Sequence, residues 1–189
     1  ELPVGDFPLE IAFDSSGNYA IVTNAFANTY SVLYVNGASS SVIGTYSGSQ
    51  YPLRLAYNQV LDQTGIGYFT TKSVVQVNPR TGAVIGTDSY SSYGSLIQVI
   101  FDEFGEPIVL TSAVGSIPGH LHRSPDVIPL SATPGYFDYC PIVQKAVVVM
   151  PGPDYATVID WSSQFVKDVS TISLRPERIR IQTMPNPSA

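Results

Sequence analysis

Short apolar runs alternate with short polar turns along the chain. In the first fifty residues the apolar runs lie at 11–13, 19–22, 31–35 and 41–43, and they are rich in β-branched and aromatic residues. The segments between them, at 14–18, 24–28 and 36–38, are rich in Asp, Asn, Ser and Gly. This pattern predicts four short strands joined by tight turns. No window of a dozen residues shows a 3.6-residue apolar period, so we expect almost no helix.

The same four-strand pattern recurs. The segment IAFDSSGNYAIVTN at 11–24 is matched at 55–71, at 99–112 and, more loosely, at 137–150, and its aromatic anchors Phe13, Tyr57 and Phe101 are each 44 residues apart. The repeats run over about 7–50, 51–94, 95–135 and 136–174, and a fifth begins at 175–189. Four-stranded units of about 40–45 residues are typical of β-propellers, in which each unit forms one antiparallel blade.

We therefore predict an all-β fold, a single β-propeller domain or propeller segment over residues 1–189 with about four blades plus partial terminal strands. Residues 1–5 are expected to end a preceding fourth strand, and residues 178–182 to form the first strand of a fifth blade. Three interpretations follow. The segment belongs to a larger propeller completed by further residues or another polypeptide, it closes as a small ring, or two copies associate to complete one ring.

The first repeat also resembles a known family, the YVTN, NHL and SMP-30-like superfamily of six- to eight-bladed propellers. The residues that carry the resemblance are Pro8, Ile11, Ala12, Phe13, Asp14, Gly17, Asn18, Val22, Thr23 and Asn24. The third repeat retains Phe101, Asp102 and Gly105, and the segment VNPRTG at 77–82 resembles the family's turn between the third and fourth strands. The fourth repeat departs most, because Pro141 and Lys145 stand where the Asp-x-x-Gly turn is expected.

The resemblance also raises an enzymatic alternative. The metal-dependent lactonases of this superfamily use an acidic residue at the head of a first strand together with Asn and Asp ligands in the channel. Glu10 and Asn24 are the nearest counterparts here, but the Glu-Gly-Pro-x-Trp segment of those enzymes is missing from this sequence. We therefore do not assign the lactonase ligands to this chain, and no catalytic residue is predicted.

Charge narrows the range of partners. The chain has 9 Lys and Arg against 15 Asp and Glu, a net charge of −6, so a positive surface for nucleic acid is not expected. No apolar run approaches the roughly 20 residues that cross a bilayer, so membrane insertion is not expected either. Only 13% of residues are charged, and Ser, Thr, Tyr and Gly supply the polar surface. This composition favours an extracellular or cell-surface protein, with the periplasm as an alternative.

Four residues are candidates for binding. His120 and His122 are the two histidines of the chain, and a His-x-His pair on one strand places both rings on one face, where they could offer two metal ligands. A third ligand is missing nearby, so we interpret them as incidental residues of a surface strand or loop. Tyr90 and Tyr93 lie in a Tyr, Ser and Gly-rich segment at 87–94, which suits protein or glycan recognition. The alternative for this segment is a polar loop between blades.

The remaining candidates are interpreted structurally. The segment 14–18 carries oxygen-bearing side chains as calcium loops do, but it lacks the Glu that would follow, so we predict a turn that Asp14 caps and Gly17 completes. Cys140, the lone cysteine, is expected to be a small buried apolar side chain, and Trp161 to pack between blades. No cofactor is predicted, with a divalent cation such as calcium as the alternative.

These inferences favour a non-enzymatic β-propeller that serves as an interaction or structural module of an exported or cell-surface protein. The expected partner is a protein or a second chain that completes the propeller, and a glycan is the alternative. The runner-up is an SMP-30-like metal-dependent lactonase or hydrolase with its site in the central channel.

Overall fold

The described residues of the chain form sixteen strands and one short 3-10 turn. The computed structural model describes residues 1–152, 155–163 and 165–170, so the predicted strand at 178–182 lies outside them. The strands are β1 (Pro8–Phe13), β2 (Tyr19–Asn24), β3 (Thr29–Tyr34), β4 (Ser41–Ser47), β5 (Pro52–Asn58), β6 (Gln63–Tyr68), β7 (Ser73–Val77), β8 (Val84–Ser89), β9 (Leu96–Phe101), β10 (Pro107–Thr111), β11 (His120–Arg123), β12 (Asp126–Pro129), β13 (Tyr136–Cys140), β14 (Lys145–Met150), β15 (Tyr155–Asp160) and β16 (Phe165–Ser170). The 3-10 turn covers Gly37–Ser39.

The strands form four antiparallel sheets of four strands each, and every sheet follows chain order: β1 to β4, β5 to β8, β9 to β12 and β13 to β16. We call these sheets blades 1 to 4. The predicted all-β, four-bladed fold with almost no helix is therefore confirmed. No helix in the described part of the chain has the length and apolar character needed to cross a membrane.

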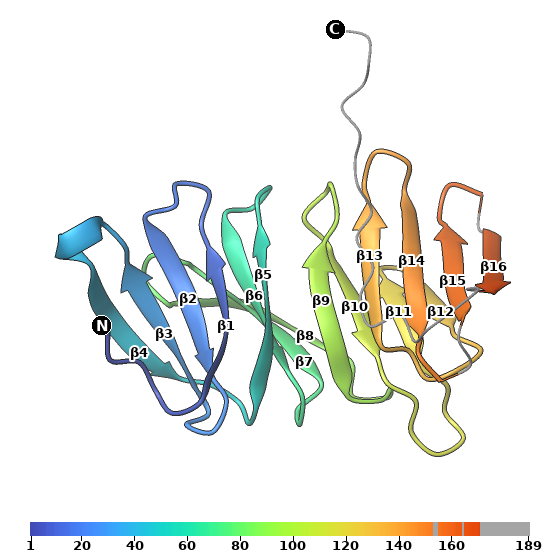
Figure 1. Cartoon of the computed structure of the whole chain (residues 1–189), viewed down its shortest axis with the longest axis horizontal. Helices are drawn as coiled ribbons and strands as arrows, with labels where there is room; N and C mark the ends of the chain where they lie inside the picture. The colour runs from blue at the N-terminus through green and yellow to red at the C-terminus, as the bar shows by residue number, and fades with distance from the viewer. Residues whose placement is uncertain (153–154, 164, 171–189) are drawn as a thin grey trace, which may run out of the picture.

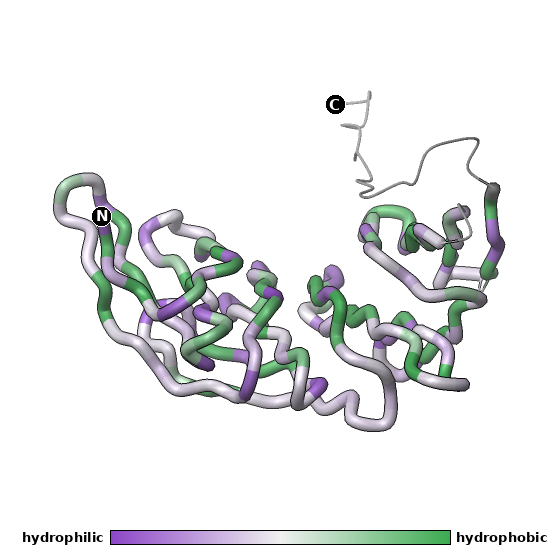
Figure 2. Tube along the Cα trace, turned by 60° about the horizontal axis from the view of Figure 1, so that its bottom comes forward, coloured by the Kyte–Doolittle hydropathy of each residue, from purple (hydrophilic) through white to green (hydrophobic). Residues whose placement is uncertain are grey.

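The blades stand side by side in an open arc. The first strands of successive blades contact one another, β1 with β5, β5 with β9 and β9 with β13. Blade 1 and blade 4 lie at opposite ends of the molecule (Figure 1), and the view along the arc shows the gap between them (Figure 2). The described strands therefore do not close into the small ring that was one of the three interpretations.

Apolar side chains fill the spaces between the blades. Blades 1 and 2 meet at one cluster, blades 2 and 3 at a second, and blades 3 and 4 at the largest. Their buried members include Ile21, Tyr30, Ile66 and Tyr68 in the first, Val74, Leu96, Val99 and Val109 in the second, and Ile108, Leu110, Leu121, Phe137, Val148 and Met150 in the third. A single blade cannot bury both of its apolar faces, so each depends on its neighbours.

The turn between β1 and β2 forms as expected. Asp14 Oδ1 accepts a hydrogen bond from the backbone N–H of Tyr19 (3.1 Å), and Gly17 has a φ of 70°, a conformation that favours glycine. The structure adds a contact that the sequence did not reveal. Arg80, from the β7–β8 turn of blade 2, pairs with Asp14 Oδ2 at 3.1 Å and also pairs with Asp62. The turn thus also fastens blade 1 to blade 2.

The N-terminal segment corrects one expectation. Residues 1–5 form no strand. Instead Leu2 and Val4 pack against Ala20, Val22 and Leu33 on the face of blade 1 that points away from blade 2. Apolar alternation alone does not distinguish a strand from an extended segment that lies across a sheet.

Two further expectations concern single residues. Cys140 is buried, as expected for a small apolar side chain. Trp161 packs against the cluster between blades 3 and 4, with its ring centroid 5.5 Å from that of Tyr139. Its role is therefore in blade packing, as predicted.

Candidate functional site

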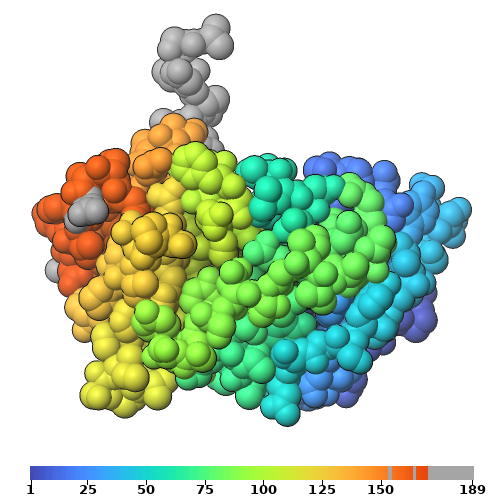
Figure 3. Space-filling model, turned by 180° about the vertical axis from the view of Figure 1, so that it is seen from behind, coloured from blue at the N-terminus to red at the C-terminus, as the bar shows by residue number. Residues whose placement is uncertain are grey.

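The four predicted binding residues gather between blades 2 and 3, although thirty positions separate the two pairs. Tyr90 and Tyr93 belong to the connection from β8 to β9, and His120 and His122 to β11. Ring centroids are 4.2 Å apart for Tyr93 and His122, 5.2 Å for Tyr90 and His122, and 5.0 Å for Tyr93 and His120. On the rear face of the molecule, residues near position 90 lie next to those near position 120 (Figure 3).

The two imidazoles share one face of β11, as the His-x-His spacing predicts. His122 pairs in register with Val109 and His120 with Thr111, so both rings face blade 2, whereas Leu121 points into the cluster with blade 4. The interpretation of incidental surface residues is wrong for His122, which is only 4% exposed. Tyr90 and Tyr93 pack against it, and no local sequence pattern indicates that this loop folds back over the strand.

Burial also fixes the charge of His122. Desolvation, with a smaller contribution from neighbouring His120, lowers the pKa of His122 to about 4, so the ring is neutral at pH 7. Its Nε2 lies 3.3 Å from Thr111 Oγ1, and that hydroxyl also donates to the carbonyl oxygen of His120 at 3.4 Å. A neutral imidazole has one donor nitrogen and one acceptor nitrogen, so His122 keeps one nitrogen that can accept a hydrogen bond.

The tyrosine loop is held in a defined shape. Lys72 Nζ donates to the carbonyl oxygen of Tyr93 (2.7 Å), and the N–H of Tyr90 donates to the carbonyl oxygen of Lys72 (2.7 Å). At Gly94 a Cβ atom would lie 1.8 Å from the carbonyl oxygen of Ser112, so no other residue fits without moving the backbone. The segment is a connection between blades, yet its tyrosines are not free in solvent.

A groove of about 310 Å³ opens beside this cluster. Its walls come from the end of β8, the tyrosine loop, the start of β10 and the β11–β12 turn. The residues that line it are Asp88, Ser89, Tyr90, Tyr93, Glu106, Pro107, His122, Ser124, Pro125, Asp126 and Val127. Three of them are acidic and none is a lysine or arginine. Burial, together with the charges of Asp88 and Glu106, raises the pKa of Tyr90 well above its usual value.

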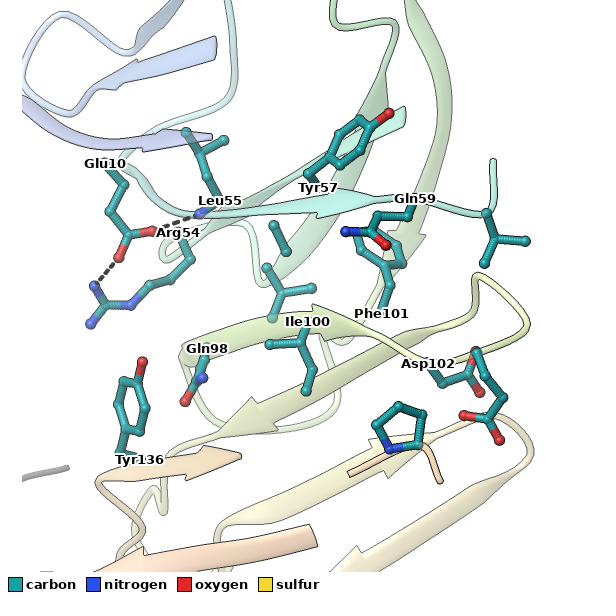
Figure 4. A pocket seen from close by; sticks show the side chains of 15 residues that line it. Glu10, Arg54, Leu55, Tyr57, Gln59, Gln98, Ile100, Phe101, Asp102 and Tyr136 are labelled. Carbon is teal, nitrogen blue, oxygen red and sulfur yellow. Dashed lines mark hydrogen bonds and ion pairs between the residues drawn. The ribbon is translucent and has the colours of Figure 1, made fainter. Parts of the chain in front are cut away.

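A larger cavity, of about 680 Å³, lies along the first strands of the blades (Figure 4). Glu10, Arg54, Gln98 and Tyr136 come from β1, β5, β9 and β13 respectively, and all four line it. The first three occupy the same repeat position, 44 residues apart. This is the side on which a complete propeller has its central channel.

Two of these polar side chains connect blades 1, 2 and 3. Glu10 Oε1 pairs with Arg54 Nη1 at 2.9 Å, and Oε2 accepts a hydrogen bond from the backbone N–H of Leu55 at 2.7 Å. Arg54 Nε then donates to the carbonyl oxygen of Ile97 at 2.6 Å. Each link runs from one first strand to the next.

Gln98 makes the corresponding link between blades 3 and 4. Its Nε2 donates to the carbonyl oxygen of Phe137 (2.9 Å), and its Oε1 accepts from the N–H of the same residue (3.0 Å). Sequence reasoning missed these links. The available signal was the recurrence of a polar residue at one repeat position inside otherwise apolar strands.

At the far end of the cavity, Arg123 forms ion pairs with two acidic residues. Its Nε donates to Asp102 Oδ2 (2.9 Å) and its Nη2 to Glu103 Oε1 (3.1 Å), and its guanidinium lies over the rings of Tyr139 and Trp161 in blade 4. Burial alone would raise the pKa of Glu103, but a hydrogen bond from Tyr139 and the charge of Arg123 hold it below its usual value. Glu103 thus joins blade 3 to blade 4, and Asp102 holds the Arg123 guanidinium in place within blade 3.

The positions considered for a lactonase are also engaged in structure. Both oxygens of Glu10 contact blade 2, and Asn24 Nδ2 donates to Thr29 Oγ1 and Ser31 Oγ within blade 1. The two side chains do not form a common ligand set. In the part of the chain that the structure describes, no three His, Cys, Asp or Glu side chains gather where they could hold a metal ion.

Comparisons with solved structures identify the fold. The hydrazine synthase of Kuenenia stuttgartiensis matches with a TM-score of 0.67 at 16% identity, over 89% of this chain and 50% of that one. The Cps50 (Swd1) β-propeller domain of Myceliophteria thermophila matches with a TM-score of 0.69 at 8% identity, over 90% of this chain and 57% of that one. The chain has a β-propeller fold. At these identities the likeness establishes the fold alone.

A third structure, the dihydro-heme d1 dehydrogenase NirN in complex with DHE, matches with a TM-score of 0.67 at 10% identity over 90% of this chain and 38% of that one. The chain therefore spans about half the length of the solved chains it matches, or less. No protein-family model and no curated protein matches the sequence.

Proposed function

We propose that this propeller segment is a non-enzymatic interaction or structural module, and that further blades, from the same polypeptide or a second chain, complete its ring. The observation that carries the proposal is the open face of blade 1. On β1, Ile11 is 53% exposed and Phe13 is 44% exposed. Both pair with β2 residues on the face that points away from blade 2.

The repeat shows what normally covers this face. Ile11, Leu55 and Val99 occupy the same position in three successive first strands. Leu55 packs into the cluster with blade 1, and Val99, which is 2% exposed, packs into the cluster with blade 2. In each case the cover is the preceding blade. The matching face of blade 1 is therefore suited to a blade as its partner.

The N-terminal segment covers only part of that face. Leu2 and Val4 lie over the side chains of β2, β3 and β4, whereas Ile11 and Phe13 on β1 remain exposed. Apolar side chains at this density on one sheet face favour a protein contact. The length of the structural matches supports the same proposal, because this chain spans about half of two of them.

The finer parts of the proposal rest on the sequence. The residues around Phe13, Asp14 and Gly17 favour the YVTN, NHL and SMP-30-like type of propeller. The low charged fraction and the polar surface of Ser, Thr and Tyr favour an exported or cell-surface protein. The lactonase alternative requires carboxylates that are free to bind a metal in the channel, and the ion pairs and hydrogen bonds that engage Glu10, Asp102 and Glu103 do not favour it.

The experiment is to measure the molar mass of the 189-residue chain over a range of concentrations. We expect concentration-dependent association through the open face, and we expect Ile11→Asp to abolish it. The matched control is Val127→Asp, which places the same charge on an exposed valine of an outermost strand. A stable, non-associating monomer would contradict the proposal, as would equal effects of the two substitutions.

A further inference from the structure

We infer that the groove between blades 2 and 3 is a binding site for an organic cation of the size of a lysine side chain. The argument combines the charge of the groove, its aromatic walls, an acceptor at its buried end and its volume. The groove lies away from the open face of blade 1, so this inference does not depend on how the ring is completed.

The charge of the groove is one-sided. Asp88, Glu106 and Asp126 line it, and no Lys or Arg is among its lining residues. None of the three carboxylates has an ion pair with a basic side chain in the described part of the chain. A concave site with uncompensated charge of one sign concentrates ligands of the other sign. Anionic ligands are disfavoured for the same reason.

The aromatic walls suit a cation as well. Tyr90 and Tyr93 both line the groove, and the π-faces of tyrosine rings attract cationic groups. Their positions are fixed by the Lys72 contacts and by the close approach at Gly94. A site whose walls are already held in place loses less entropy when a ligand binds.

His122 supplies an acceptor at the buried end. Its ring lines the groove, and the bond between Nε2 and Thr111 Oγ1 is its only hydrogen bond within the described residues. The side chain is almost wholly buried, and as a neutral imidazole it has one nitrogen that can accept a hydrogen bond. An ammonium group needs acceptors and offers three donors, so an imidazole nitrogen and nearby carboxylates complement it.

The volume sets the size of the ligand. A space of about 310 Å³ is at the lower end of small-molecule sites and accommodates one extended side chain rather than an oligosaccharide. A lysine side chain presented by a partner protein is the ligand that matches both the size and the charge. A neutral glycan would make no use of the three carboxylates.

The test is an NMR titration at low salt with Nα-acetyl-lysine-N-methylamide, and with its norleucine counterpart, which has the same carbon chain and no ammonium group. We expect the lysine compound to shift the resonances of Tyr93 and His122 with a Kd on the order of 1 mM, as suits so small a ligand. Added salt should weaken this binding. The norleucine compound and a neutral disaccharide should leave the spectrum unchanged.

Substitutions make the test specific. Glu106 is exposed and its side chain makes no hydrogen bond in the described structure, so Glu106→Gln should fold normally and weaken binding about tenfold. Asp6→Asn is the matched control, because it removes one negative charge from an exposed position on blade 1. Equal binding of the lysine and norleucine compounds, an unchanged Kd in Glu106→Gln, or no shift at about 50 mM ligand would overturn the inference.

Discussion

The open face of blade 1 and the covered faces of blades 2 and 3 carry the same kind of residue at the same repeat position. Ile11 is half exposed, whereas its counterpart Val99 is almost completely buried. Both residues lie on the first strand of a blade, on the face that points toward a preceding blade, and only Val99 has such a blade in the structure. The comparison shows that burial in a propeller is a property of the interface and not of the blade.

The polar side chains that link neighbouring blades also differ from one another in burial. Glu10, Arg54 and Gln98 each reach forward from one blade to the backbone of the next. Arg80 pairs with Asp14 of the neighbouring blade 1, and Arg123 lies over Tyr139 and Trp161 of the neighbouring blade 4, but Arg123 is far more buried than Arg80. The arc is therefore held together by apolar clusters and by polar links whose energies depend on their burial.

The largest expected effect separates the covered face from the open one. Val99→Asp would place a charge in the cluster between blades 2 and 3 and should lower the free energy of unfolding by roughly 4 kcal/mol. Ile11→Asp should change the stability of the monomer by no more than about 1 kcal/mol, because its side chain can remain in water. Urea unfolding of both variants measures the difference. Equal losses of unfolding free energy in the two variants would contradict the claim that a preceding blade covers Val99 and leaves Ile11 open.

Next in size is the comparison of the two arginines. Arg123→Met removes the partner of the buried carboxylate of Asp102 and should cost roughly 3 kcal/mol of unfolding free energy. Arg80→Met should cost clearly less, because the Arg80 side chain is 38% exposed against 11% for Arg123, and its pair with the exposed Asp62 is screened by water. Thermal unfolding of both variants is the measurement. A greater loss for Arg80→Met would reverse the assigned order.

Acid should weaken the covered interface at His122. The folded pKa of about 4 lies below the ordinary value of 6.5, so this residue contributes full stability above pH 6.5 and loses it as the pH falls toward 4. The loss should reach roughly 3 kcal/mol.

His122→Phe is the control for this effect, since it cannot take up a proton in the same pH range. Chemical denaturation at several pH values should show a shallower pH dependence for the variant than for the unsubstituted chain. Comparing the two cancels the contribution of carboxylates such as Glu103. Parallel curves would contradict the burial of a neutral imidazole.

The smallest of these effects concerns the link between blades 3 and 4. Gln98→Leu leaves the N–H and carbonyl groups of Phe137 without their partner and should cost about 2 kcal/mol. Gln59→Leu, on the exposed rim of the same cavity, is the matched control and should stay within about 0.5 kcal/mol of the unsubstituted chain. Hydrogen exchange at the N–H of Phe137 gives a local measurement. Unchanged exchange in Gln98→Leu would contradict the link.

The sequence predicted the blades because their signals are local. Apolar strands and turns such as Asp14 to Gly17 are set by residues within a few positions of one another, and a constant spacing then predicts the repeat. Residues 1–5 were wrongly expected to form a strand, because an extended apolar segment has the same pattern whether it pairs with a strand or lies across a sheet face.

The candidate site was predicted only in part. Tyr90, Tyr93, His120 and His122 were selected by residue type, and the structure brings them together, but nothing in the sequence indicated that His122 is buried. The acidic residues of the groove come from three separate elements, and their proximity depends on how blades 2 and 3 dock. Contacts of that kind are non-local, so a single sequence does not reveal them.

The open face of blade 1 is the central claim, and the molar mass of the chain as a function of concentration tests it most directly. Sedimentation equilibrium of the unsubstituted chain should show self-association at high concentration, and Ile11→Asp should restore a monomer whose unfolding free energy differs by no more than about 1 kcal/mol. A chain that stays monomeric at every concentration, with or without Ile11→Asp, would contradict the claim that this face is made to receive a blade.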